Sequence, residues 1–331
     1  MTDKDAPLPI TAEETTPLWR KTVPLGAVFD IIASLCLTFT WLGSLGRFHW
    51  LLDLFSHFRL QYVLACAAVL LFALLRRRAV LILAAMLSLL WNVQIIYAVH
   101  RTAQPPPSPG LAGKPLKVMI FNVMATNDNH VAAIEHVINV DPDIVCLLET
   151  SDDWRLSLDP LRVKYPHRVE ELGSGAFGIA CYTRLPLKSS EVRRIDPWGL
   201  PSVILTMDHL GMPLTFIGMH TMPPIGGGEA AVWRDQLTRF GNLVAGIDGN
   251  VILGGDLNAT PWCHGMRLLL EKSGLGFHSA APVWPPTWGR HLPVMIPIDH
   301  VLTKGSFVIQ KRQIGPSMGS DHRSVTVELI R

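Results

Sequence analysis

Three short polar clusters in the last third of the chain each adjoin an apolar run. They are residues 254–258 (Gly-Gly-Asp-Leu-Asn), 298–300 (Ile-Asp-His) and 320–322 (Ser-Asp-His). Runs of this kind form strands, and neighbouring strand ends can bring their side chains to one rim of a sheet. Asp, Asn and His gathered at such a rim are the groups that metal-assisted hydrolysis uses.

Three upstream residues follow the same pattern of a polar residue after an apolar run. They are Asn122, Glu149 and His220. Glu149 directly follows Ile144–Leu148, and a carboxylate oxygen there is a hard donor of the kind that magnesium prefers. The sequence therefore predicts a metal-dependent hydrolytic site.

The six motifs, in this order, resemble the endonuclease/exonuclease/phosphatase superfamily, over residues 117–328. That superfamily includes pancreatic-type deoxyribonucleases, abasic-site endonucleases, bacterial sphingomyelinases and inositol-phosphate 5-phosphatases. The resemblance implies an α/β fold: a four-layer α/β sandwich of two packed mixed sheets flanked by helices. It also implies hydrolysis of a phosphate ester with Mg²⁺ or Mn²⁺ as cofactor.

The resemblance implies a role for each residue of the site. The metal would be held by Glu149, with Asn122 helping to position metal or phosphate, and Asp321 would bind the metal directly or contact one of its ligands. The other five roles are catalytic. His220 would donate to the scissile phosphate, Asp256 would orient or deprotonate the attacking water, Asn258 would stabilise the transition state, and Asp299 would orient His322 on the opposite side of the phosphate.

The spacing of the residues adds three expectations. Asp256 and Asn258 are two apart, so an extended segment would point both to one face. Gly254 and Gly255 are expected to keep the backbone open for substrate. His300 follows Asp299 directly, so along a strand it points away and is assigned a structural role.

Two residues are predicted to bind substrate. Arg234 lies near the start of the helix expected after the glycine-rich residues 226–228. Trp288 belongs to a group with Trp262 and Trp284 that could line a substrate groove, with packing in the core as the alternative.

The elements expected to carry these residues alternate between strands and helices. Strands are predicted at residues 118–123, 144–148, 179–182, 251–253, 301–302 and 324–329. A hairpin joins residues 202–207 to 214–219, and helices cover residues 130–140 and 229–247.

Before residue 100 the chain is strongly apolar. Residues 23–45, 60–75 and 79–99 are almost free of charge, and a bilayer core needs about 20 apolar residues. Three transmembrane helices within residues 22–100 are therefore predicted, with a cytoplasmic tail at 1–21. Arg59 and Arg76, at the ends of the middle segment, are expected to extend their charges to the lipid headgroups.

The arginine triplet at residues 76–78 and the basic residues before residue 22 indicate that the N-terminus faces inward. Three spans then place the catalytic domain, residues 116–331, outside the cytoplasm, which in a bacterium means the periplasm or exterior. The Pro-rich linker, residues 101–115, is expected to hold this domain about 20 Å from the membrane.

The substrate is less tightly constrained. From residue 105 onward, 20 Lys and Arg balance 21 Asp and Glu, so there is no basic stripe for nucleic acid. A nuclease-like phosphodiesterase is still favoured, with nucleic acid preferred over a lipid headgroup. The alternatives are a phospholipase C-type enzyme or phosphoinositide phosphatase, and a catalytically silent membrane-tethered binding module. The predicted partners are this substrate and the lipid bilayer, and no protein partner is predicted.

Overall fold

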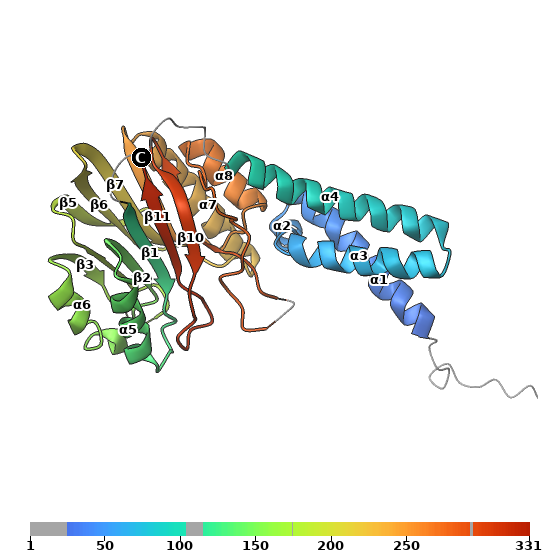
Figure 1. Cartoon of the computed structure of the whole chain (residues 1–331), viewed down its shortest axis with the longest axis horizontal. Coiled ribbons are helices and arrows are strands. Elements are labelled where there is room, and N and C mark those ends of the chain that lie inside the picture. Colours follow the sequence, from blue (N-terminus) through green and yellow to red (C-terminus); the bar gives the residue numbers. More distant parts are fainter. Residues whose placement is uncertain (1–24, 104–114, 174, 292–293) are drawn as a thin grey trace, which may run out of the picture.

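The computed structural model describes residues 25–103, 115–173, 175–291 and 294–331. The predicted tail, residues 1–21, and residues 104–114 of the predicted linker lie outside this part. The chain has two regions, an N-terminal helical bundle (residues 25–103) and an α/β sandwich (residues 115–331), which lie end to end in Figure 1.

Two mixed sheets form the sandwich. In spatial order the first contains β10 (Val308–Ile314), β11 (Val325–Ile330), β1 (Leu116–Asn122), β2 (Ile144–Leu148), β4 (Ile179–Thr183) and β3 (His167–Glu171). The second contains β5 (Leu187–Arg194), β6 (Pro201–His209), β7 (Met212–His220), β8 (Asn250–Asp256) and β9 (Asp299–Lys304). The pairs β1–β2 and β7–β8 are parallel, and the other pairs are antiparallel. The predicted α/β fold with two mixed sheets is confirmed.

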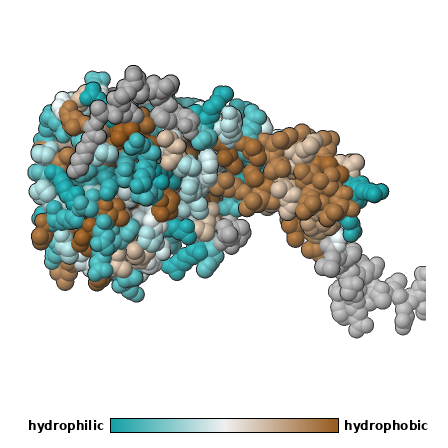
Figure 2. Space-filling model, in the orientation of Figure 1, coloured by the Kyte–Doolittle hydropathy of each residue, from teal (hydrophilic) through white to brown (hydrophobic). Residues whose placement is uncertain are grey.

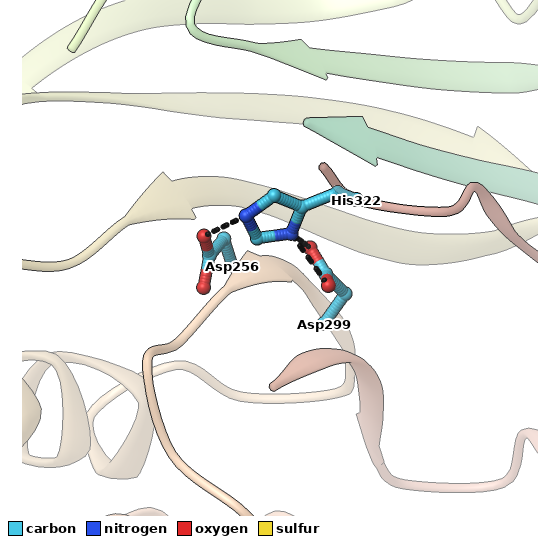
Figure 3. A group of neighbouring side chains, drawn as sticks. All are labelled: Asp256, Asp299 and His322. Atoms are coloured by element: carbon cyan, nitrogen blue, oxygen red, sulfur yellow. Dashed lines mark hydrogen bonds and ion pairs between the residues drawn. The ribbon is translucent and has the colours of Figure 1, made fainter. Parts of the chain in front are cut away.

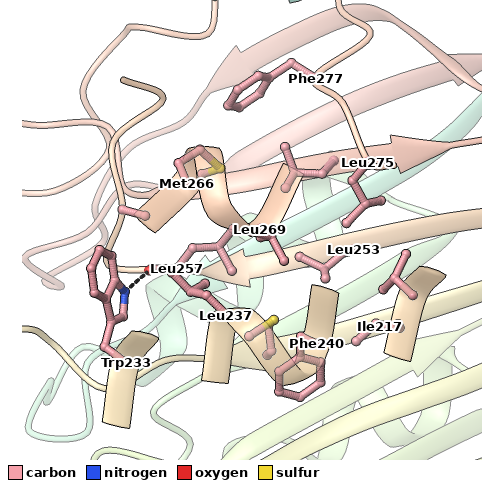
Figure 4. Packing of buried hydrophobic residues seen from close by; sticks show 14 of the residues in the cluster. Ile217, Trp233, Leu237, Phe240, Leu253, Leu257, Met266, Leu269, Leu275 and Phe277 are labelled. Carbon is pink, nitrogen blue, oxygen red and sulfur yellow. Dashed lines mark hydrogen bonds between the residues drawn. The ribbon is translucent and has the colours of Figure 1, made fainter. Parts of the chain in front are cut away.

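Alternating apolar side chains place the sheets between helices, because successive side chains of a strand point to opposite faces. In β1, Ile120 packs into the core between the sheets, whereas Phe121 packs into the outer core with α5 (His130–Val140), α6 (Asp159–Lys164) and the short helix η3 (Asp152–Trp154). The second sheet is covered by α7 (Gly227–Ala245) and α8 (His264–Ser273). Figure 4 shows the core between the second sheet and these two helices, where the Trp233 indole donates to the Leu257 carbonyl at 3.0 Å.

Two glycines at the end of β8 allow neighbouring parts of the sandwich to pack closely. From the sequence, these glycines were expected to leave room for the substrate instead. A Cβ on Gly254 would lie 2.5 Å from the Ile120 side chain, and one on Gly255 would lie 1.8 Å from the Met219 carbonyl oxygen. Gly254 therefore lets the two sheets approach each other, and Gly255 lets β8 lie against β7.

The N-terminal bundle contains α1 (Leu25–Leu42), η2 (Gly43–Leu45), α2 (Trp50–Ser56), α3 (Arg59–Leu75) and α4 (Ala79–Ala103). Two helical segments, Gly26–Leu45 and Ala79–Ala103, are long and apolar enough to cross a membrane. A third span is present if α2 and α3, bent by 65° at their junction, are counted as one. On the face seen in Figure 2, the surface of the bundle is largely apolar, with hydrophilic residues at the end remote from the sandwich.

Arg59 does not extend to the headgroup region as expected. It is only 1% exposed, and its guanidinium donates to the Thr40 carbonyl at 2.8 Å, to Asn92 Oδ1 at 3.1 Å and to Ser44 Oγ at 3.2 Å. A buried cation needs hydrogen-bond partners, and Arg59 finds them on α1, η2 and α4. It therefore joins the helices.

The bundle packs directly against the sandwich, so the two regions are not held apart as the Pro-rich composition suggested. The Asp53 carboxylate of α2 accepts the backbone N–H groups of His264 at 2.8 Å and Gly265 at 3.2 Å, at the start of α8. At the end of α4, the Ala103 carbonyl accepts Ser279 N at 2.6 Å, and the Ala103 side chain joins the core of α7 and α8.

Candidate active site

One edge of the sandwich collects the polar ends of several strands. Asn122 ends β1, and Glu149 follows the adjacent parallel strand β2. His220 ends β7 beside Asp256, which ends β8 and pairs in turn with Asp299 at the start of β9. His322 precedes β11, the antiparallel neighbour of β1. Both sheets therefore contribute side chains to one site.

Asn122 lies at the centre of this cluster and is fully buried. Its Nδ2 lies 2.8 Å from Glu149 Oε1, 3.2 Å from Asp256 Oδ2 and 3.3 Å from His322 Nε2. Its Oδ1 accepts Met124 N at 3.1 Å, which fixes the orientation of the amide. Asn122 therefore connects the first sheet to the residues of the second.

Glu149 adopts a left-handed backbone conformation, with φ of 61°. This conformation is unfavourable for a residue with a Cβ and is concentrated at functional sites. The carboxylate accepts Asn122 Nδ2 at one oxygen and Ala125 N at the other, at 3.1 Å, and remains partly exposed. It is thus held rigidly at the mouth of the site.

Two imidazoles flank the buried carboxylate of Asp256. Its Oδ2 lies 3.4 Å from His220 Nε2 and 3.5 Å from His322 Nε2. Burial alone would raise the pKa of Asp256, but the charges of His322 and His220 outweigh it and lower this pKa to about 2. Asp256 is therefore an ionised hydrogen-bond acceptor at neutral pH.

His322 lies between two carboxylates, as Figure 3 shows. Its Nδ1 is 2.9 Å from Asp299 Oδ2, opposite the contact with Asp256. Burial would lower the pKa of His322, but the charges of Asp299 and Asp256 raise it to about 10. Burial raises the pKa of Asp299. Asp299 therefore orients an imidazole that is protonated at neutral pH.

Asn258 departs from the expected extended geometry. Its φ is 46°, in the left-handed region, so Asp256 and Asn258 do not simply point to the same face of a strand. Asn258 N donates to Asp256 Oδ1 at 3.0 Å, and Asn258 Nδ2 donates to the Thr221 carbonyl at 2.8 Å. The turn fixes the Asp256 carboxylate and leaves Asn258 partly exposed at the site.

The remaining predicted residues divide into two groups. Trp288 lies at the site: its indole donates to Asp321 Oδ2 at 2.9 Å, and its ring centroid is 6.5 Å from that of His322. Arg234 is not brought into the cluster, since it donates to the Gly46 carbonyl of the bundle at 2.9 Å. His300 is buried and contacts the Ala259 carbonyl at 2.8 Å, in keeping with its structural assignment.

Two supporting hydroxyl groups were not assigned roles from the sequence. Ser320 Oγ donates to the Asn122 carbonyl at 2.8 Å and accepts His322 N at 3.0 Å, so it joins two residues of the site. Thr287 Oγ1 accepts Asp299 N at 3.0 Å. Ser320 lies inside a recognised motif, whereas nothing in the sequence around Thr287 connects it with Asp299.

The donors at this edge fit a divalent metal ion. Asp256, Asp299 and His322 can each offer one atom so that the three atoms lie within 4.8 Å of one another. His322 is protonated in the metal-free site, so it would have to release its proton to act as a ligand. Glu149 adds a carboxylate at the mouth, beside the same Asn122 amide. Carboxylate oxygens with one imidazole suit Mg²⁺ or Mn²⁺.

A four-layer sandwich with buried carboxylates and imidazoles at one edge of two sheets defines a hydrolase of the phosphoesterase class. The family model described as "Endonuclease/Exonuclease/phosphatase family" matches residues 91–322. The chain belongs to this family of metal-dependent phosphoesterases.

Solved structures share the fold. Truncated TDP2 from Caenorhabditis elegans is 19% identical, with a TM-score of 0.51, covering 67% of this chain and 99% of its own. Sphingomyelinase C from Streptomyces griseocarneus is 16% identical, with a TM-score of 0.52 and coverages of 65% and 99%. The 3′ phosphatase NExo from Neisseria, bound to a product DNA hairpin, is 15% identical, with a TM-score of 0.52 and coverages of 64% and 98%. The comparison with curated proteins gave no match.

Proposed function

We propose that this chain is a membrane-anchored phosphodiesterase in which water attacks the phosphate ester in one step. The observation that carries the proposal is the convergence of His220, Asp256 and His322 around Asn122, with Asp299 behind His322. These groups can accept a proton from water and donate to phosphoryl and leaving oxygens, as an in-line displacement requires.

Asp256 is the group that orients the attacking water and accepts its proton. As the water oxygen bonds to phosphorus, the bond between phosphorus and the leaving oxygen breaks. The protonated His322 donates to the oxygens that gain negative charge, and Asp299 holds the imidazole in place. His220 is fixed through Nδ1 at the Ala176 carbonyl, at 3.1 Å, and directs Nε2 into the site.

Glu149 is proposed as the principal metal ligand, with Asn122, whose amide donates to it, and Asp321 as further ligands. The bound ion would neutralise charge on the phosphate and polarise the ester. Asn258 lies at the rim, where its side chain stabilises the transition state. Trp288 contributes an aromatic surface for the substrate.

The direct test is hydrolysis of a bis-aryl phosphodiester by the full chain in detergent. EDTA should abolish turnover, and Mg²⁺ or Mn²⁺ should restore it. Full activity after exhaustive chelation would contradict metal dependence. A phospho-enzyme trapped by acid quench would contradict the one-step mechanism.

Membrane attachment is the second part of the proposal, and the two or three apolar candidate spans support it. The start of α1 and the arginine-rich α3–α4 turn lie at the end of the bundle remote from the sandwich (Figure 1). The basic residues there favour a cytoplasmic location for that end. An alkaline phosphatase fused after Arg331 should be active. An inactive fusion, together with an active cytoplasmic reporter at the same position, would reverse the topology.

A further inference from the structure

An apolar cavity of about 270 Å³ lies between the N-terminal bundle and the candidate active site. The bundle contributes Leu54 and Phe58, and the sandwich contributes Ile225, Ile296 and Ile298. We call this space the junction cavity. It is slightly smaller than the roughly 300–1,000 Å³ of complete small-molecule sites, so it suits one part of a larger ligand.

The junction cavity opens onto the catalytic edge. Asn258 and Trp288 line it, and Trp288 also donates to Asp321. A group seated in the cavity would therefore lie beside the residues proposed to handle the phosphate.

A polar cavity of about 310 Å³ lies on the other side of the Trp288–Asp321 contact. Asp321 lines it together with Arg290 and Arg323. The site is thus bordered by an apolar cavity on one side and by two cations on the other. A ligand that combines a hydrocarbon portion with an anionic portion matches this division.

His57 is a buried polar residue in the wall of the junction cavity. It lines the cavity, is 4% exposed, and neither ring nitrogen has a hydrogen-bond partner in the part of the chain that the structure describes. A buried imidazole without partners is costly.

The position of the cavity identifies the source of the hydrocarbon. Leu54, His57 and Phe58 lie at the bend between α2 and α3, the helix pair that counts as one candidate span. Figure 2 shows the apolar surface of the bundle reaching the sandwich at this junction. The cavity is therefore lined in part by helices that are themselves candidates to cross the membrane, where lipid chains lie.

On the basis of the proposed function, we infer that the substrate is a membrane lipid phosphoester whose hydrocarbon portion occupies the junction cavity. Nucleic acid, the substrate class favoured by the sequence, carries no hydrocarbon chain to fill this space. The balance of 20 basic and 21 acidic residues after residue 104 also provides no general attraction for a polyanion.

Photo-crosslinking tests the inference without relying on activity. The full chain is reconstituted in phosphatidylcholine vesicles containing phosphatidylglycerol with a diazirine on its acyl chain. Illumination should give adducts at residues 223–225 and 296–298 of the sandwich. Adducts confined to α1, α3 and α4 would overturn the inference.

A pair of variants sharpens this experiment. Ile225 is 77% exposed, so Ile225→Asp should fold while placing a charge at the apolar cavity. In this variant, the yield of adducts at residues 296–298 should fall at least about tenfold. Val163→Asp changes another exposed apolar residue, 90% exposed and on α6, and should leave the yield of these adducts unchanged. Equal labelling in both variants would contradict the inference.

Competition separates the lipid from nucleic acid. A single-stranded DNA oligonucleotide should not reduce labelling of residues 296–298, whereas unlabelled phosphatidylglycerol should. Displacement by the oligonucleotide alone would overturn the inference in favour of a nuclease. Labelling in the cavity without any hydrolysis of a bis-aryl phosphodiester would instead reject the proposed function.

Discussion

His322 and the carboxylates around it form the electrostatic centre of the site. Asp299 and Asp256 lie on opposite sides of its ring, and all three side chains are almost completely buried. Buried charges are tolerated when they are paired and hydrogen-bonded. The site therefore holds an imidazolium at neutral pH that can donate to an anionic phosphate.

The raised pKa of His322 predicts how stability depends on pH in the metal-free protein. Its folded-state pKa is about 10, against an ordinary value of 6.5. The associated stabilisation is complete below about pH 6.5 and is lost as the pH rises towards about 10. Thermal unfolding in EDTA should show this decline, and Asp299→Asn should reduce it because the neutral amide no longer supports the proton. The same slope in the variant would contradict the assignment.

Glu149→Gln should raise the metal concentration needed for half-maximal activity at least about tenfold, because an amide oxygen is a weaker ligand than a carboxylate. The fold should be retained, since the side chain is partly exposed and Gln can still accept from Asn122. A metal titration of activity with a melting curve for each protein measures this. Glu135→Gln, on an exposed part of α5, is the matched control. An unchanged metal requirement would mean that Glu149 is not a ligand.

The residues of the site were predictable where a strand end fixes them. His220 and Asp256 end β7 and β8 after apolar runs, and Asp299 begins the neighbouring strand β9. The order of these motifs along the chain, together with the family resemblance, was sufficient to find them. The turn at Asn258 and the Thr287 contact were not predictable. They depend on tertiary hydrogen bonds between segments far apart in the sequence.

At the scale of secondary structure, the central strands were predictable because their side chains are buried on both faces. The structure confirms β1, β2, β4, β6, β7, β8 and β11 close to their predicted positions. β3, β5 and β10 were missed. All three are edge strands in which most residues are partly or fully exposed, so their sequences lack the apolar pattern that identifies a strand.

Packing at the end of β8 predicts that Gly255→Ala destabilises the protein. The new Cβ would meet the Met219 carbonyl oxygen of the adjacent strand, and backbone atoms cannot move aside easily. We expect a loss of about 1–3 kcal/mol or more, measured by chemical unfolding in detergent. Gly228→Ala in α7 is the control, since its Cβ would meet no atom within 4 Å. Equal stability of the two variants would contradict this packing.

The contact between α2 and α8 predicts a second effect on stability. Asp53 is buried and caps the start of α8 from another part of the chain. Asp53→Ala would leave two backbone donors without an acceptor, a loss of about 1–3 kcal/mol. Asp53→Asn keeps one acceptor oxygen and should lose less. Melting temperatures of the full-length variants test the order, and a wild-type value for Asp53→Ala would show that the cap is dispensable.

Across the whole molecule, the main departure from the sequence-based prediction is the junction between bundle and sandwich. The Pro-rich composition after residue 103 suggested a spacer, but composition does not report where the preceding helices pack. Asp53 and Ala103 bring the bundle onto α8 and its core instead. The active edge consequently lies next to the helices proposed to enter the membrane.

The central claim is that side chains from both sheets act as one catalytic unit, and turnover of three variants tests it most directly. Asp256→Ala and His322→Ala should each lower kcat at least about 10²-fold on a bis-aryl phosphodiester with Mg²⁺. The double variant should be little worse than the poorer single variant, because residues that act together lose their contribution together. Wild-type turnover by folded His322→Ala, or losses that multiply in the double variant, would contradict the account.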